Sequence, residues 1–116
     1  MSAANPTQKT TVVCVRKAEL KKRGYRDFEH WNESKDHVYI GRNMSFYIHG
    51  ASKSKWHNPY SVKKYGLEKC LELYKTYLLN NEELMSQLDQ LRHKKLGCWC
   101  KPFSPCHGDI LAELVN

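Results

Sequence analysis

No apolar stretch of this 116-residue sequence approaches the length that a membrane-spanning helix requires. The first residues, Met1 to Pro6, also lack the apolar core of a secretory signal peptide. We therefore expect a soluble, intracellular protein of the cytoplasm that does not bind membranes. The five cysteines are odd in number and have no secretory context, which argues against a disulfide framework. The remaining interpretations of the cysteines are reduced thiols, a metal site or a reactive cysteine.

Acidic residues are in the minority, because 12 Asp and Glu stand against 19 Lys and Arg, for a formal net charge of +7. An excess of this sign favours anionic partners such as nucleic acid or phosphorylated small molecules, although it also serves solubility. The hydrophobic fraction of 41% is typical of a folded chain. The length suits one domain, so we predict a loose tail over 1–9 and a single domain over 10–116.

The pattern of apolar residues predicts alternating strands and helices. Strands are expected at Thr10–Val15, His37–Ile40 and Lys95–Trp99. Helices are expected at Tyr65–Leu79, at Glu82–Arg92 and after Cys106, whereas Ala18–Lys35 is ambiguous. Strands that are separated by helices imply crossover connections. The sequence therefore predicts an α/β protein, a small three-layer Rossmann-like domain with a short, mostly parallel sheet.

Polar and reactive residues gather where the predicted strands end. Arg42 follows the second strand, and the third strand runs into a loop that is rich in cysteine. Since the carboxyl ends of parallel strands meet at one edge of a sheet, we expect a ligand site there. Arg42 and the start of the last helix would hold an anion. The turn before the first long helix would add Trp56 as a stacking surface and Asn58 and Tyr60 as hydrogen-bonding groups.

Cys106 and His107 open the last predicted helix. The free N–H groups and the dipole of a helix start stabilise a thiolate. In a catalytic interpretation Cys106 is a nucleophile and His107 a proton carrier, with Asp109 or Cys100 as the other candidate partner of Cys106. The chemistry would be group transfer or hydrolysis on a phosphorylated or nucleotide-like compound.

The same loop carries residue types that bind zinc, namely Cys98, Cys100, Cys106 and His107. The spacing argues against a zinc knuckle, because a single residue separates Cys98 from Cys100 and no second Cys-x-x-Cys is present. Zinc is therefore an alternative cofactor. A structural interpretation places Cys98 and Trp99 in the core on opposite faces of the strand, and we favour it for these two residues.

Several motifs together resemble an uncharacterised family, domain of unknown function 4326, which is found in bacteria, phages and viruses. The motifs are Val38-Tyr39-Ile40-Gly41-Arg42, Trp56-His57-Asn58-Pro59-Tyr60, Tyr74–Leu78 and Leu96–Asp109. One position departs from the family pattern, which usually reads Trp-Gly-Asn-Pro and has His57 here. The final loop is also similar to the strand–helix junction of domain of unknown function 488, which implies a Rossmann-like arrangement. Neither resemblance brings a reaction.

These observations lead to two functional expectations. The first is a small protein that acts on, or senses, a nucleotide or a nucleic-acid-related anionic compound at the carboxyl ends of the strands. The alternative is a non-catalytic basic module that binds nucleic acid, with or without a structural zinc ion at the cysteine loop. The sequence leaves open whether the protein is an enzyme.

Overall fold

A small open sheet of three parallel strands lies at the centre of the protein, which a computed structural model describes over residues 9–100 and 105–116. The strands are β1 (Thr11–Cys14), β2 (His37–Tyr39) and β3 (Lys95–Cys98). Their spatial order is β1-β3-β2, so the last strand of the chain is the central one. Cys14 lies beside Cys98, and Tyr39 beside Gly97, so the carboxyl ends of all three strands meet at one edge.

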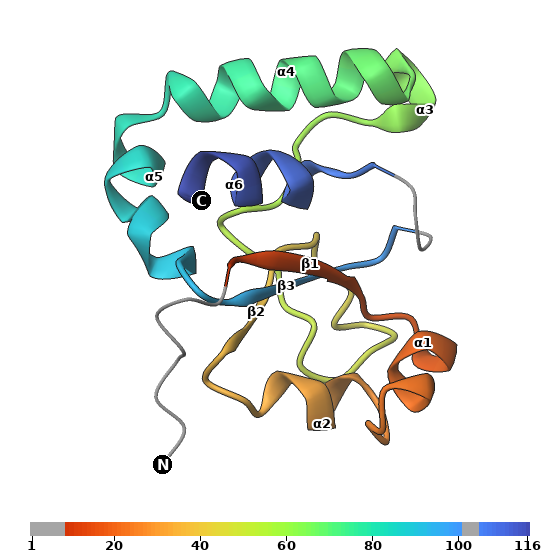
Figure 1. The fold of residues 1–116 in the computed structure, drawn as a ribbon. Helices are drawn as coiled ribbons and strands as arrows, with labels where there is room; N and C mark the ends of the chain where they lie inside the picture. The colour runs from red at the N-terminus through yellow and green to blue at the C-terminus, as the bar shows by residue number, and fades with distance from the viewer. Residues whose placement is uncertain (1–8, 101–104) are drawn as a thin grey trace.

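Helices cover both faces of this sheet (Figure 1). On one face lie α4 (Leu67–Leu79), α5 (Glu82–Gln87) and α6 (His107–Val115). On the other lie α1 (Lys17–Lys22) and α2 (Phe28–Asn32). Each face has its own buried cluster, one around Tyr74, Leu96 and Leu111 and the other around Phe28 and Trp31. None of the helices in the described part of the chain is long and apolar enough to span a membrane.

The parallel sheet and the mixture of helices and strands confirm the α/β prediction, but several boundaries differ. The predicted helix from residue 65 is broken at Gly66, whose φ of 81° separates α3 (Val62–Tyr65) from α4. The predicted helix from residue 82 becomes 3₁₀ after α5, in η1 (Leu88–Leu91). The ambiguous segment contains α2 and all of α1 except its first residue, Lys17. Residues 1–8 of the predicted tail lie outside the described residues.

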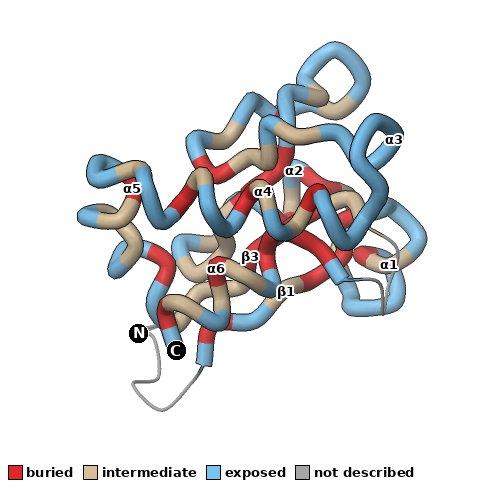
Figure 2. Tube along the Cα trace, turned by 90° about the horizontal axis from the view of Figure 1, so that it is seen from above, coloured by how far each residue is buried: buried red, intermediate tan, exposed pale blue. Residues whose placement is uncertain are grey.

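Burial follows this arrangement. Figure 2 shows buried residues along the strands and on the inward sides of α4 and α6, whereas α3 is exposed along its whole length. α6 lies close to the sheet because Gly108 has no side chain. A Cβ atom at that position would lie 2.8 Å from Cδ1 of Ile40 and 3.1 Å from both methyl groups of Val12. The glycine therefore allows the first turn of α6 to sit against Val12 of β1 and Ile40, the residue that follows β2.

Candidate functional site

A pocket of about 480 Å³ lies where β2 and β3 end and α6 begins. Its other wall is formed by residues 58–63 and the first turns of α4. The volume falls in the range of ligand pockets, about 300–1,000 Å³. Six of the eight residues that the sequence assigned to the site line this pocket: Arg42, Asn58, Tyr60, Cys100, Cys106 and His107.

The other two predicted residues, Trp56 and Asp109, serve the fold rather than line the pocket. Trp56 is 2% exposed in the core, so its ring is not available as a stacking surface. Its carbonyl oxygen accepts a hydrogen bond of 2.8 Å from the Tyr74 hydroxyl. Asp109 caps α6, because its Oδ2 accepts from the Cys106 N–H at 2.8 Å while Cys106 Sγ accepts from the Gly108 N–H at 3.3 Å. Two backbone N–H groups at the start of α6 are therefore already hydrogen-bonded to side chains of the same helix start.

The turn that carries Asn58 and Tyr60 is held by a buried thiol from α4. Oδ1 of Asn58 accepts from the Tyr60 N–H at 2.9 Å, and Nδ2 of Asn58 donates to Cys70 Sγ at 3.2 Å. The Cys70 thiol in turn donates to the Tyr60 carbonyl oxygen at 3.3 Å. This network fixes one wall of the pocket. His57 needs no glycine conformation, since the only described non-glycine residue with a positive φ is His93.

His107 connects α6 to β2 rather than to Cys106. Its Nε2 donates to the carbonyl oxygen of Ile40 at 2.7 Å, and its ring packs edge-on against Tyr74. Burial lowers the pKa of His107, which favours the neutral ring. No hydrogen bond joins the side chains of Cys106 and His107 in the described structure, because residues at the start of a helix point in different directions.

Three thiols converge at the inner end of the pocket. The sulfur atoms of Cys98, Cys100 and Cys106 all lie within 4.8 Å of one another, and those of Cys98 and Cys106 are 3.4 Å apart. Cys98 and Cys106 are each 3% exposed, whereas Cys100 is half-buried and faces the pocket. All five cysteines are free thiols. Three of the four zinc ligands that the sequence suggested are thus together, without His107.

The three thiols hold their protons unequally. Hydrogen bonds from the thiols of Cys106 and Cys98 hold the pKa of Cys100 well below its ordinary value. Contact with Cys100, together with burial, raises the pKa values of Cys98 and Cys106. The sequence pointed to Cys106 as the thiol of low pKa, but in the structure it is Cys100. Cys100 is the least buried residue of the three, and its thiol accepts hydrogen bonds from both neighbours.

Among the residues that the structure describes, the pocket lining has cations and no carboxylate. Arg42 and Lys63 both line it, and neither forms an ion pair with any residue in the described ranges. Lys63 was not foreseen, because it lies on α3, a single helical turn without apolar periodicity. The sequence signal for this turn is Ser61, whose side chain caps the helix by accepting from the Lys64 N–H.

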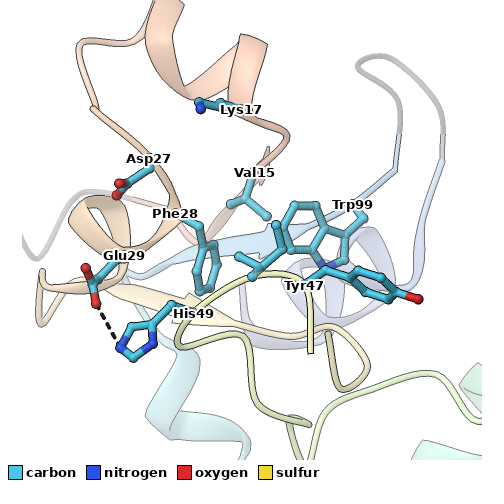
Figure 3. A pocket seen from close by; sticks show the side chains of 9 residues that line it. Val15, Lys17, Asp27, Phe28, Glu29, Tyr47, His49 and Trp99 are labelled. Carbon is cyan, nitrogen blue, oxygen red and sulfur yellow. Dashed lines mark ion pairs between the residues drawn. The ribbon is translucent and has the colours of Figure 1, made fainter. Parts of the chain in front are cut away.

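A second, smaller pocket of about 210 Å³ lies against the other face of the sheet (Figure 3). Phe28 and Trp99 stand at its centre, and the ion pair between Glu29 and His49 lies at its edge. Trp99 is half-buried, and its Nε1 donates to the Tyr39 hydroxyl. None of the predicted site residues lines this pocket. With two acidic residues in its lining, it is a poorer place for an anion than the pocket beside the thiols.

The comparisons with known proteins agree on an uncharacterised group. A family model described as "Domain of unknown function (DUF4326)" matches residues 24–116. The chain is 35% identical over 87 residues to "Uncharacterized protein R718" of Acanthamoeba polyphaga mimivirus, an alignment that covers 68% of this chain and 66% of the viral protein. It is 43% identical over 53 residues to "Uncharacterized 12.4 kDa protein in nrdA-td intergenic region" of Enterobacteria phage T4, covering 42% and 48%.

The chain therefore spans about half to two thirds of the length of these relatives. No solved structure matches it. Both relatives are uncharacterised proteins, one from a virus and one from a phage, and their names state no activity.

Proposed function

The chain belongs to the family described as "Domain of unknown function (DUF4326)", and we propose that it binds an anionic, nucleotide-like compound in the pocket beside the three thiols. The observation that carries the proposal is the charge of the lining. Arg42 and Lys63 line one cavity, and none of its described lining residues carries a carboxylate. A guanidinium group binds phosphate oxygens through two parallel hydrogen bonds, and a lysine adds a point charge beside them.

The position of the pocket supports the same proposal. Open parallel sheets of the Rossmann-like kind bind ligands outside the carboxyl ends of their strands, and this pocket borders the ends of β2 and β3. We regard the three-stranded sheet with its helices as a reduced form of that three-layer arrangement. Tyr60 lines the pocket and is half-buried, so in this proposal it takes the place of the buried Trp56 as the aromatic residue beside a nucleobase.

Isothermal titration calorimetry with nucleoside mono-, di- and triphosphates tests the proposal. We expect at least one of them to bind and Arg42→Ala to weaken it about tenfold or more, because a hydrogen bond to a charged group contributes about 1.5–3 kcal/mol. Arg23→Ala is the matched control, since Arg23 is exposed beyond α1 and does not line the pocket. Binding that Arg42→Ala and Arg23→Ala weaken equally would refute the pocket as the binding site.

The alternative, a basic module that binds nucleic acid, gives a different result. Its affinity for a generic single-stranded oligonucleotide, followed by fluorescence anisotropy, would fall steeply with salt because phosphate contacts release counterions. Arg42→Ala and Arg23→Ala would then have similar small effects, and no mononucleotide would bind. That combination of results would replace the pocket proposal by the alternative.

A further inference from the structure

Three of the five cysteines meet at one point of the described structure. Cys98 ends β3, Cys100 follows it on the same side, and Cys106 is the N-cap of α6. We infer that these three thiols bind one zinc ion whose fourth coordination position opens into the pocket. This inference is independent of the nucleotide proposal, because it rests on the sulfur atoms and not on Arg42 or Lys63.

The spacing of the sulfur atoms suits a zinc ion. With Zn–S bonds of about 2.3 Å in a tetrahedral site, neighbouring sulfurs lie about 3.8 Å apart. The sulfurs of Cys98 and Cys106 are 3.4 Å apart, and all three lie within 4.8 Å of one another. Small side-chain rotations therefore bring the three sulfurs to bonding distance of a shared ion.

One backbone donor is already in place for a metal-bound thiolate. The Gly108 N–H donates to Cys106 Sγ at 3.3 Å, and the positive end of α6 faces the same sulfur. Outer hydrogen bonds of this kind orient metal ligands and tune the metal. Apolar side chains, among them Ile40, Leu96 and Leu111, pack in the same buried cluster as Cys98 and Cys106 and keep water from that side.

No fourth protein ligand from the described residues joins the group. Across residues 9–100 and 105–116, Cys98, Cys100 and Cys106 are the only such convergence of three or more His, Cys, Asp or Glu side chains. Nε2 of His107 donates to Ile40, and the carboxylate of Asp109 accepts from the Cys106 N–H. Three protein ligands with one open position are typical of reactive zinc sites, whereas structural sites have four. Since Cys100 and Cys106 line the pocket, the open position faces it.

The other two cysteines, Cys14 and Cys70, lie outside the group of three and provide a comparison. Cys14 lies within β1, and Cys70 hydrogen-bonds to the turn at Asn58 and Tyr60. Both are buried and neither belongs to the group of three. Cys14 is the closer match, because it lies beside Cys98 in the register of β1 and β3. It therefore provides the control for substitutions in the group.

The test is metal binding by the 116-residue chain, purified under reducing conditions with no metal-affinity step. We expect about one zinc per chain by elemental analysis. After the zinc is exchanged for Co²⁺, we expect a thiolate-to-cobalt band in the near ultraviolet and the visible bands of a tetrahedral ion. Cys98→Ser, Cys100→Ser and Cys106→Ser should each weaken Co²⁺ binding by about 100-fold or more, beyond the usual effect of losing an outer hydrogen bond. Cys14→Ser should bind as the wild type does.

Absence of bound metal after reconstitution with Zn²⁺ or Co²⁺ would overturn the inference, as would equal binding by Cys100→Ser and Cys14→Ser. Cys100 is the safest ligand to replace, because it is half-buried and follows the strand, and circular dichroism checks that the variant is folded. Imidazole should shift the visible cobalt bands if one position is open, and unchanged bands would refute the open position. Arg42→Ala should keep the cobalt spectrum, which separates this result from failure of the nucleotide proposal.

Discussion

Nε2 of His107 lies 2.7 Å from the carbonyl oxygen of Ile40 and joins the first turn of α6 to the residue that follows β2. This bond spans 67 residues of the chain, and both of its partners are buried. The neighbouring Cys106 lies at the same helix start, with its sulfur 3.4 Å from that of Cys98. We therefore expect His107 to help to position Cys106 against β3.

Replacing His107 tests that role. His107→Ala leaves the Ile40 carbonyl oxygen buried without its donor, which costs about 1–3 kcal/mol. We expect the free energy of unfolding in urea to fall by that amount. The Co²⁺ affinity should fall too, because Cys106 loses its fixed position. The matched substitution is His49→Ala, whose side chain is 85% exposed and which should change stability by less than about 0.5 kcal/mol. Unchanged stability of His107→Ala would contradict the positioning role.

Gly108 supports the same junction through close packing. Gly108→Ala places a Cβ atom 2.8 Å from Ile40 Cδ1 and should push α6 away from the sheet. Overpacking of this kind costs about 1–3 kcal/mol, more than the up to about 1 kcal/mol that alanine gains over glycine in a helix. We expect a lower free energy of unfolding, measured in urea. Glu113→Ala, on the exposed side of α6, should leave stability nearly unchanged. A stabilised Gly108→Ala variant would show that α6 can adjust without cost.

The charge of the pocket can be changed at Asn58. In Asn58→Asp the side chain still accepts from the Tyr60 N–H, but it adds a negative charge to a lining whose described residues include no carboxylate. We expect the nucleotide affinity measured by calorimetry to fall about tenfold or more, with a smaller loss of stability from the lost donor to Cys70. Asn80→Asp makes the same change at an exposed position outside the pocket. Equal affinities of the two variants would count against anion binding here.

The cap of α2 predicts a pH dependence that is separate from the pocket. The His30 N–H donates to the Asp27 carboxylate at 2.9 Å, and this bond lowers the pKa of Asp27. A group with a lowered folded-state pKa stabilises the fold above its unfolded pKa, which is about 3.9, and this contribution is lost as the pH falls through the folded value. Asp27→Asn keeps a capping side chain without the titration. Its stability should depend less on pH below about 4 in acid unfolding followed by circular dichroism. If Asp27→Asn and the wild type lost stability equally as the pH falls, the proposed role of the cap would be contradicted.

The sequence placed most of the site through a single topological rule. Arg42 and Cys100 are far apart in the chain, yet both line the pocket because the carboxyl ends of parallel strands meet at one edge. That rule depends only on recognising the strands, and the strand patterns are short but clear. Alternation along β3 and the residues that follow it likewise predicts that Cys98 and Cys100 lie on one side of the chain, where their sulfur atoms converge.

The same reasoning misplaced side chains whose direction depends on distant contacts. Trp56 was expected in the pocket, but the Tyr74 hydroxyl, 18 residues away, holds the Trp56 carbonyl and the ring lies in the core. Cys106 and His107 are adjacent in sequence, but the helix start turns one toward Cys98 and the other toward Ile40. Such directions follow from tertiary packing, which periodicity does not encode.

Alkylation of the thiols tests both the accessibility of Cys100 and its proposed binding of zinc. Of the five thiols only Cys100 is not fully buried, so in the metal-free protein its sulfur should attack iodoacetamide first, forming a C–S bond and releasing iodide. Peptide mass spectrometry identifies the modified cysteine. One equivalent of Zn²⁺ should slow this reaction strongly, because the metal takes the electron pair that attacks carbon. In Cys98→Ser, which lacks one of the proposed ligands, the same zinc should protect Cys100 much less, whereas Cys14→Ser should be protected like the wild type. First modification at Cys14 or Cys70, or equal protection in all variants, would mean that the three sulfurs do not act together.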